Sequence, residues 1–306
     1  MLTIHNLLGI KYPILQGAMA HVSTASLVIA VSEAGGLGIL ASGGFSAQEF
    51  RDNIHKIKAA TDKPYAVNLA LSYPNIDEII DVAIDEKVEI VTAGGGNPAP
   101  YFPKWLEAGF KVIPVVGNSK MAKKVQDLGA IACIFEGAEA GGHIGALNTM
   151  AALPAVAEAV DIPVISAGGI GSGKQILAAE ILGAQGVQMG TRFLASNECE
   201  VHENMKEAVL QAQDYDITVT GYMSHPVRVL KNAFTQKYTA LEKEGKTEEL
   251  EELATGGSRR AARQGDMEWG SVMVGQSVSN IKKRESVEEI IQKVLKEYQE
   301  AKDSIQ

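Results

Sequence analysis

The chain has 306 residues, of which 46% are hydrophobic and 6% aromatic, and its formal net charge at pH 7 is −9. That length suits two ordinary domains or one large α/β barrel with an insertion, and the acidic charge excludes a general nucleic-acid binder. No apolar run approaches a membrane span, and the first residues lack the apolar core of a secretion signal. Cys133 and Cys199 are too few for a disulfide framework, and no Cys or His spacing predicts a metal site. We expect a soluble cytoplasmic protein with no metal, membrane or nucleic-acid partner.

Short apolar runs alternate with amphipathic segments along the first two thirds of the chain, which indicates repeated strands and helices. Helical spacing is clearest where Phe50, Ile54 and Ile57 recur. Strands are expected at residues 12–19, 37–41, 65–71, 90–93, 111–116, 130–135, 163–166 and 186–189. Helices are expected at residues 23–34, 46–60, 75–86, 119–128, 149–160 and 173–182. Asn75 or Asp77 is the expected cap of the helix at 75–86.

Eight strands alternating with helices predict an α/β fold, a (β/α)8 TIM barrel; the alternative, a doubly wound sheet, rarely carries so many consecutive units. The pattern breaks after Arg192, where the chain becomes polar and helical. We interpret residues 197–266 as a lid inserted after the eighth strand, and residues 1–196 and 267–306 as the barrel domain. The amphipathic helix expected at 287–302 would supply the barrel's missing outer helix.

One glycine-rich stretch stands out, the ten residues EGAEAGGHIG from Glu136 to Gly145, which follow the sixth strand. Its glycines allow the backbone to approach a ligand closely, and His143 can exchange a proton near neutral pH. Taken alone, the stretch is equally consistent with an ordinary glycine-rich turn and a solvent-facing histidine. Its position at the carboxyl end of a barrel strand favours a catalytic role for His143.

Two further glycine runs follow the seventh and eighth strands, SAGGIGSG at 166–173 and QMGT at 188–191. In α/β barrels a phosphate often binds after these two strands. Free backbone N–H groups at the turns and at the following helix N-termini form an anion site without a lysine. Either run alone can have a purely steric reason, but the two together predict a phosphate-bearing ligand.

The ends of strands one, three and four add polar or glycine-rich positions, namely residues 16–19, Asn68 and residues 92–95. An asparagine in an apolar strand requires a hydrogen-bond partner, either a structural network or the edge of a planar heterocycle. A flat cofactor with a phosphate tail satisfies all these positions. FMN fits, because the chain has no dinucleotide fingerprint with its downstream acid.

Ten runs of the sequence resemble the nitronate monooxygenase superfamily, and among its members they are most similar to flavin-dependent enoyl-acyl-carrier-protein reductases of the FabK type. The EAGGH and QMGT motifs are specific to the superfamily, whereas the runs VTAGGGNP and HPVRVLKN favour the reductase. The runs are YPILQGAMA, AGGLGIL, KPYAVN, VTAGGGNP, VIPVV, EGAEAGGHIG, SAGGI, VQMGTRF, HPVRVLKN and GSVMVGQ.

The resemblance implies an FMN enzyme that reduces the 2,3 double bond of an enoyl-acyl-carrier-protein or enoyl-CoA substrate with NADH or NADPH, in fatty acid synthesis. It also implies a homodimer, and enzymes of this type respond to monovalent cations. His21 stands where such reductases usually have tryptophan. The expected catalytic residue is His143, and the expected cofactor-binding residues are Gly17, Ala18, Met19, Asn68, Thr92, Glu136, Gly141, Gly142, Ala167, Gly168, Gly169, Gln188, Met189, Gly190, Thr191, Met273 and Gln276.

In this chemistry hydride passes from nicotinamide through the flavin to the β-carbon, and the protein supplies placement and electrostatics. His143 can protonate the α-carbon or donate to the thioester oxygen. Glu136 and Glu139 either orient His143 or bind the ribityl chain. One alternative is a nitronate monooxygenase, in which the nitronate reduces FMN and O2 reoxidises it. Another is a flavin-binding or acyl-binding protein without turnover, which the intact glycine stretch disfavours.

Basic side chains in the expected lid suggest a docking surface for an acidic carrier protein with a phosphorylated arm. The alternative is a solvated helix face neutralised by nearby glutamates. The residues in question are Arg228, Lys231, Arg259, Arg260 and Arg263.

Overall fold

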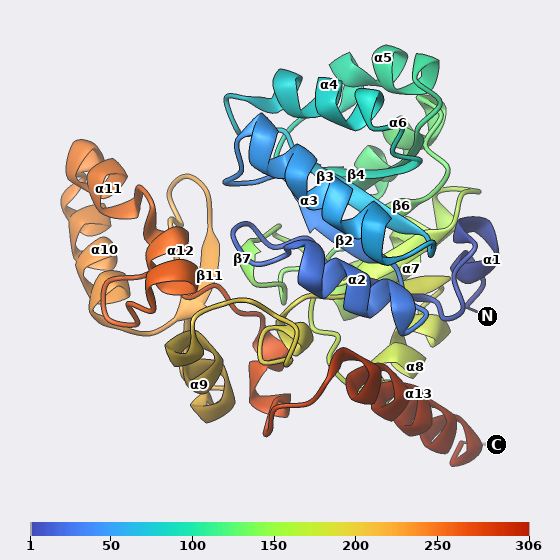
Figure 1. The fold of residues 1–306 in the computed structure, drawn as a ribbon. Helices are drawn as coiled ribbons and strands as arrows, with labels where there is room; N and C mark the ends of the chain where they lie inside the picture. Colours follow the sequence, from blue (N-terminus) through green and yellow to red (C-terminus); the bar gives the residue numbers. More distant parts are fainter. Residues whose placement is uncertain (1, 306) are drawn as a thin grey trace.

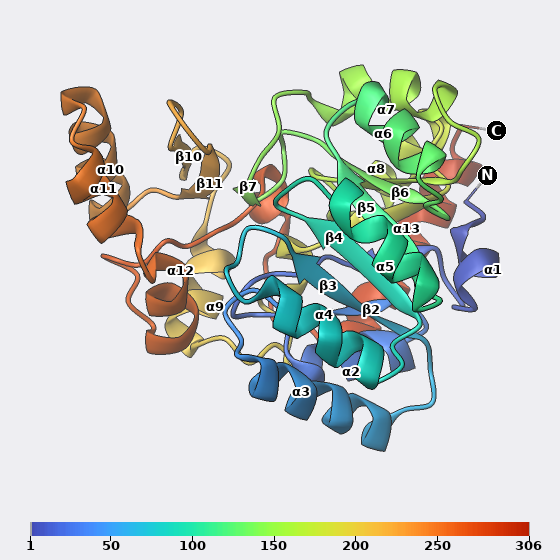
Figure 2. The same cartoon turned by 90° about the horizontal axis from the view of Figure 1, so that it is seen from above.

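The computed structural model describes residues 2–305, and its centre is an eight-stranded parallel sheet in the order β1-β9-β8-β6-β5-β4-β3-β2. A parallel bridge between Leu15 and Leu37, with the backbone N–H of Gln16 donating to Leu37, joins the two edges and closes the barrel. The predicted TIM barrel is confirmed (Figures 1 and 2). Its strands are β1 (Ile14–Gln16), β2 (Gly38–Ala41), β3 (Tyr65–Ala70), β4 (Ile90–Gly94), β5 (Lys111–Val116), β6 (Cys133–Glu136), β8 (Val164–Ala167) and β9 (Gly186–Met189).

Helices cover the outside of the barrel between successive strands. Ser46 and Glu49 form a capping box at the start of α3, as Ser46 accepts from the Glu49 N–H and Glu49 accepts from the Ser46 N–H. The expected side-chain cap of α4 is wrong, because the Asn75 amide donates instead to the Phe45 carbonyl at 3.0 Å. The outer helices before residue 190 are α2 (Ala25–Glu33), α3 (Ala47–Ala60), α4 (Ile76–Asp85), α5 (Phe102–Glu107), α6 (Ser119–Asp127), α7 (Thr149–Glu158) and α8 (Gly173–Ile181).

Alternating strand residues build two apolar layers, because successive side chains point to opposite faces of a strand. The outer layer lies between strands and helices. The inner layer fills the barrel, and α1 (Ile4–Leu8) closes its amino end with Ile4 and Leu8. The remaining buried inner residues are Ile10, Leu15, Leu37, Ile39, Ala66, Ile90, Ile113, Ala132, Ile134, Ile165 and Ala167. The amino end of the barrel is therefore closed, and a site can form only at the carboxyl ends of the strands.

The insert, as residues 197–266 are called below, is not purely helical as expected. It contains an antiparallel pair of strands, and β11 also pairs with β7 (Gly142–His143) from the barrel's central glycine stretch. Figure 1 shows β7 and β11 between the barrel and the outlying helices α10 and α11. The elements of the insert are α9 (Glu203–Gln211), β10 (Ile217–Thr220), β11 (Val227–Leu230), α10 (Ala233–Glu244), α11 (Thr247–Ala254), α12 (Gly257–Arg259) and a π-helix (Arg260–Gln264).

The last helix, α13 (Val287–Asp303), packs against α8 and α2, so it takes the outer position after β9 that the sequence predicted. A buried ion pair between Arg192 and Glu285, at 2.5 Å, ties the end of the barrel to the segment that leads into this helix. No helix within residues 2–305 is both long enough and apolar enough to span a bilayer.

Candidate functional site

A cavity of about 300 Å³ opens at the carboxyl ends of the barrel strands. Its floor has one residue at or just beyond the carboxyl end of each strand, two positions after a residue that points into the barrel, so both point inward. Asn68 follows Ala66 in this way, and Glu136 follows Ile134. The eight floor residues are Gly17, Ala41, Asn68, Thr92, Val115, Glu136, Ala167 and Gln188.

The cavity brings together His143 and fifteen of the seventeen residues expected to bind the cofactor. Two expected residues lie elsewhere. Met189 points outward into the layer beneath the helices, because it alternates with Gln188 along β9. The Gln276 side chain is exposed, and only its backbone N–H is used, donating to the Glu139 carbonyl at 2.9 Å.

Glycine is required in the turn after β8. Gly168 and Gly169 have φ angles of +91° and +77°, and a Cβ on Gly168 would lie 2.8 Å from the Gly137 carbonyl oxygen. Within residues 2–305, the backbone N–H groups of Gly168, Gly169 and Gly190 have no protein acceptor. These donors fit the phosphate of a flat cofactor.

The N-terminus of α8 does not belong to this anion site, contrary to expectation. The carboxylate of Glu297, on α13, accepts the Gly173 N–H at 2.9 Å, and Gln175 accepts the Gly171 N–H at 2.9 Å. A protein carboxylate already satisfies the positive end of this helix. The anion site is therefore confined to the turns themselves.

The two glutamates of the glycine stretch have different environments. Glu139 accepts hydrogen bonds from the backbone N–H and hydroxyl of Thr149, at 2.9 and 3.0 Å, and so braces the stretch against the start of α7. Both glutamates line the cavity, but the carboxyl of Glu136 has no hydrogen-bond partner among residues 2–305. Desolvation raises the pKa of the Glu136 carboxyl to about 7. Glu136 is thus the carboxyl available to a ligand, and Glu139 is structural.

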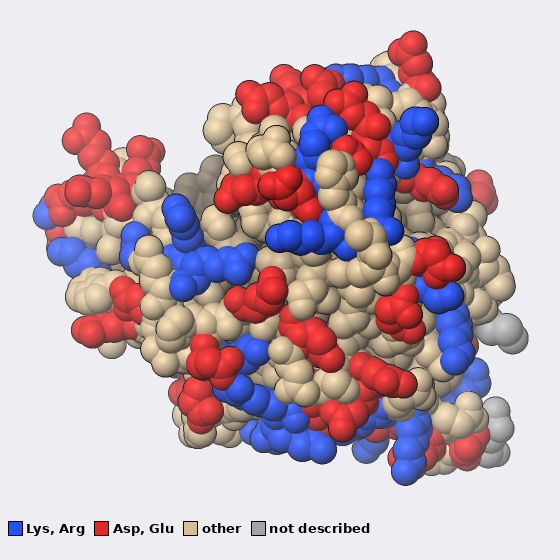
Figure 3. Space-filling view, in the orientation of Figure 1, with Lys and Arg blue, Asp and Glu red and all other residues tan. Residues whose placement is uncertain are grey.

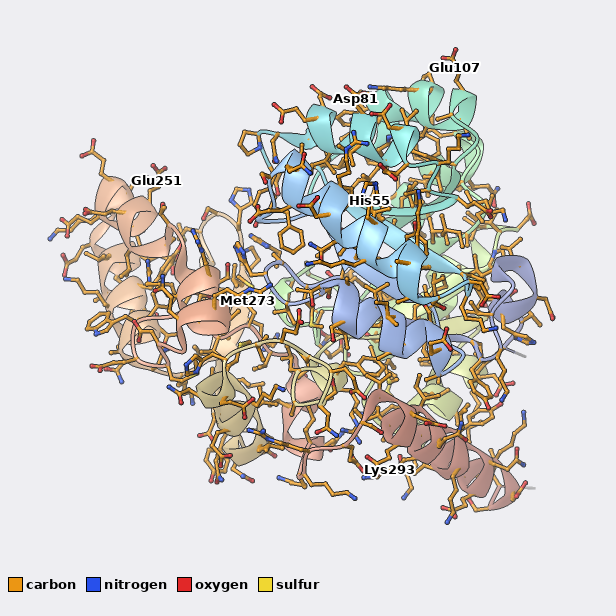
Figure 4. All side chains as sticks on the ribbon, in the orientation of Figure 1. His55, Asp81, Glu107, Glu251, Met273 and Lys293 are labelled. Atoms are coloured by element: carbon orange, nitrogen blue, oxygen red, sulfur yellow. The ribbon has the colours of Figure 1, made fainter. Side chains whose placement is uncertain are left out.

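Replacing Glu136 by glutamine should flatten the pH dependence of stability. The folded-state pKa lies above the ordinary value of 4.5, so the neutral carboxyl's contribution is complete below that value and is lost as the pH rises through about 7. The parent should lose more unfolding free energy than Glu136→Gln between about pH 5 and about pH 8. Urea unfolding at both pH values measures this. Glu107→Gln, at the outer end of α5 (Figure 4), should behave as the parent does; equal slopes in all three proteins would contradict the assignment.

His143 reaches the cavity from β7, where it pairs with Val227 of β11. Its side chain is exposed at the cavity mouth, yet desolvation by the surrounding residues and the charge of His225 lower its pKa. The imidazole is therefore neutral at neutral pH and offers one N–H donor. An exposed ring of this kind can also exchange its proton with water.

The docking hypothesis is wrong for Arg228. Its side chain is buried, and the guanidinium donates to the carbonyls of Ala138 and Ala140 at 2.8 and 3.2 Å. Arg228 of β11 thus also holds the glycine stretch. Burial of the guanidinium lowers its pKa.

Lys231 and Arg260 are also engaged internally. Lys231 donates to the Tyr215 carbonyl at 2.6 Å. Arg260 donates to three backbone carbonyls, which holds the turn after α11 in place, and these belong to Leu253, Thr255 and Trp269. Of the five basic residues singled out in the sequence, the Arg259 side chain has no hydrogen-bond partner among residues 2–305, and Arg263 has one long contact.

The cavity wall includes residues that the sequence analysis did not name. Ser72 and Tyr73 follow β3, and this position at a strand's carboxyl end was the available signal. Met205, Ser258 and Ala262 come from the insert, and no local pattern marks them. Figure 4 shows Met273, which was expected, between the barrel and the helices of the insert.

Known proteins with similar sequences and structures support one family. The family model described as nitronate monooxygenase matches residues 2–86 and 75–297. The (3aS,4S,5R,7aS)-5-hydroxy-7a-methyl-1-oxo-octahydro-1H-indene-4-carboxyl-CoA dehydrogenase of Rhodococcus jostii is 38% identical over 268 residues, 87% of this chain and 75% of its own. A Staphylococcus saprophyticus protein named "Probable nitronate monooxygenase" is 32% identical over 323 residues, 90% of this chain and 91% of its own. The structure of FabK from Thermotoga maritima aligns with a TM-score of 0.96 and 45% identity, covering 99% of this chain and 97% of that one.

Proposed function

The chain belongs to the nitronate monooxygenase family, and we propose that within it the protein is an FMN-dependent reductase of enoyl thioesters that uses NADH or NADPH. The observation that carries the proposal is the likeness to FabK over 99% of the chain. A dehydrogenase whose name specifies a carboxyl-CoA, a thioester, is also among the relatives. Both relatives favour a thioester rather than a nitronate as the substrate.

The cavity fits FMN on the observations given above. Asn68 and Gln188 of the floor would face the ring, and the turns at Gly168 and Gly190 would hold the phosphate through their free N–H groups. The protonated Glu136 carboxyl can donate one further hydrogen bond. When bound, FMN supplies the hydride transfer between nicotinamide and substrate. NADH or NADPH and the thioester would enter from the cavity mouth.

His143 is proposed to donate a hydrogen bond to the thioester oxygen and a proton to the α-carbon. A neutral imidazole N–H at the cavity mouth can hydrogen-bond the thioester oxygen, where negative charge develops during reduction. The same ring, exposed to water, can take up a proton from solvent, deliver it to the α-carbon as the imidazolium, and return to the neutral form. Arg228 and Glu139 both hold the glycine stretch, which fixes where His143 stands. Their role is positioning.

The insert would act as a lid over the bound substrates, since Met205, Ser258 and Ala262 already form part of the cavity wall. An enoyl-acyl carrier protein or enoyl-CoA is the proposed substrate. The homodimer and the response to monovalent cations stay predictions from the family resemblance.

The second candidate function, oxidation of nitronates with O2, is favoured by the relatives that carry that name. In that reaction His143 would act as a base or as an anchor for the nitronate. The two activities differ in their requirement for nicotinamide. A monooxygenase consumes O2 with the nitronate alone, whereas a reductase consumes NADH with the thioester alone.

Steady-state assays separate the two candidates. The purified protein should oxidise NADH or NADPH in the presence of crotonyl-CoA without O2, and should consume little O2 with propyl nitronate. The physical reason is that a hydride acceptor replaces O2 as the oxidant of the reduced cofactor. Absorbance at the nicotinamide band and an oxygen electrode measure the two rates. Rapid nitronate-dependent O2 uptake without thioester-dependent NAD(P)H oxidation would contradict the proposal.

A further inference from the structure

Two of the seven arginines lack the partners that the other five have. Three are in ion pairs with carboxylates and two donate to backbone carbonyls; they are Arg51, Arg192, Arg284, Arg228 and Arg260. Arg259 makes no hydrogen bond or ion pair with any residue between 2 and 305. Arg263 makes one long contact, from Nη1 to the Glu200 carbonyl at 3.4 Å. In a protein of net charge −9, unpaired guanidinium groups call for an explanation.

The helical segment that carries both arginines borders the cavity. Arg259 follows Ser258 and Arg263 follows Ala262, and both of those neighbours line the cavity wall. The two arginines are four residues apart on one helical segment, so their side chains leave the same face. Figure 3 shows Lys and Arg side chains gathered over α12, at the side where the insert meets the barrel.

His21, on the barrel side, lies within electrostatic reach of this pair. It lies in the turn before α2 with a φ of +62°, and its ring covers Gly44. Its neighbour Ala20 lines the cavity. Desolvation lowers the pKa of His21, and the charges of Arg263 and Arg259 lower it further, so all three groups lie within electrostatic reach.

Glu49 lies near both arginines, whose charges help to lower the pKa of its carboxyl, but the hydrogen bonds of the nearby carboxylates go to other residues. Glu49 accepts from the backbone N–H and the hydroxyl of Ser46 in the capping box of α3. The Glu200 carboxylate accepts from the Thr24 hydroxyl at 2.6 Å. Neither forms an ion pair with Arg259 or Arg263 among residues 2–305.

We propose that Arg259 and Arg263, with His21 on the barrel side, form a second anion site at the cavity mouth that binds the phosphate or diphosphate of the substrate. This site is distinct from the glycine turns after β8 and β9, and it rests on the proposed function for the identity of its ligand. Planar guanidinium groups bind phosphate oxygens with paired hydrogen bonds. A ring nitrogen of His21 adds a third contact point, and two positive charges attract an anion to an otherwise acidic molecule.

Both substrates of the proposed reaction carry phosphate close to the part that enters the cavity. A pyridine nucleotide has a diphosphate, and coenzyme A and the arm of a carrier protein have a phosphate on pantetheine. The chemistry recognised is the same. Substrates that lack the phosphate separate the two sources. They are 1-benzyl-1,4-dihydronicotinamide in place of NADH, and crotonyl-N-acetylcysteamine in place of crotonyl-CoA.

The test compares Arg259→Gln, Arg263→Gln and the double variant with the parent. Arg284→Gln is the matched control, because it removes the same charge at a surface position paired with Glu203. Isothermal titration with inorganic pyrophosphate measures the site without any reaction. Each single variant should weaken pyrophosphate binding about tenfold, the scale for one hydrogen bond to a charged group, and the double variant more. Arg284→Gln should bind as the parent does.

Steady-state KM values then show whether the nucleotide or the thioester supplies the bound phosphate. If the nucleotide is the source, the double variant raises KM for NADH or NADPH but not for benzyl-dihydronicotinamide. If the thioester is the source, KM rises for crotonyl-CoA but not for the cysteamine thioester. Unchanged pyrophosphate binding in the double variant overturns the site, whatever the reaction proves to be. Equal increases in KM for substrates with and without phosphate overturn it as well. A parent that binds pyrophosphate but does not oxidise NAD(P)H would refute the reductase and leave the anion site supported.

Discussion

Replacing His143 by alanine should slow the reoxidation of the reduced protein by crotonyl-CoA by about a hundredfold or more, the usual scale for a lost proton-transfer group or oxyanion donor. Reduction by NADH should stay near the parent rate, because that step requires no proton at the substrate. The flavin should also be retained, since His143 is an exposed side chain at the cavity mouth. Anaerobic stopped-flow absorbance of the flavin measures both half-reactions separately.

His225→Ala is the control for this prediction. His225 is an exposed residue outside the cavity wall, and its charge helps to lower the pKa of His143. Its removal should leave the rate near the parent's while moving the acid limb of the pH profile to higher pH. A His143→Ala protein that unfolds or loses flavin would make the histidine structural. Unchanged reoxidation in that variant would remove His143 from the mechanism.

Replacing Gly168 by alanine should abolish stable flavin binding. The parent should release FMN, not FAD, on denaturation, because the cavity offers one pair of glycine turns for one phosphate. An alanine at position 168 would have the unfavourable φ of +91°, and its Cβ would lie 2.8 Å from the Gly137 carbonyl oxygen. The turn must therefore move. Movement displaces the N–H groups that would hold the phosphate, and the strain costs roughly 1–3 kcal/mol. Chromatography of the released flavin and the ratio of flavin to protein absorbance test this.

Gly109→Ala separates strain from crowding. Gly109 also has a positive φ, +79°, but a Cβ there meets no atom within 4 Å, and the residue lies outside the cavity wall. This variant should lose stability by a similar strain energy and keep its flavin. Loss of flavin in both variants would trace the effect to general destabilisation. Full flavin in Gly168→Ala would show that the turn after β8 does not bind the cofactor.

Much of the barrel follows from alternation along the strands, which is a local property. β5 and β9 have the bounds that their apolar runs predicted, and other strands differ at their ends by up to a few residues. The insert was harder to predict from the sequence, because its strand β11 forms only through pairing with β10 and with β7. That pairing joins residues far apart in the sequence, and no periodicity within residues 227–230 reveals it. Helix α5 was missed because it is only six residues long.

The candidate site was predictable to the extent that it consists of strand ends. Glycine runs and one inward polar residue, such as Asn68, mark the carboxyl end of a barrel strand, so the sequence could place them together. Hydrogen bonds between residues far apart in the sequence could not be predicted in this way. The sequence around Arg228 is typical of a surface cation, but its guanidinium contacts Ala138 and Ala140. Glu297 lies far in sequence from the helix end that it caps. Such pairs depend on tertiary packing alone.

The central claim is that the electrons taken from NAD(P)H pass to the carbon–carbon double bond of a thioester. The most direct measurement is a single turnover without O2. The protein is first reduced with one equivalent of NADH or NADPH, then mixed with crotonyl-CoA while flavin absorbance is followed, and the acyl product is identified by mass spectrometry. The account predicts that flavin absorbance returns and that one butyryl-CoA forms per flavin. A reduced protein that crotonyl-CoA leaves unchanged, but that O2 or a nitro compound reoxidises, would contradict it.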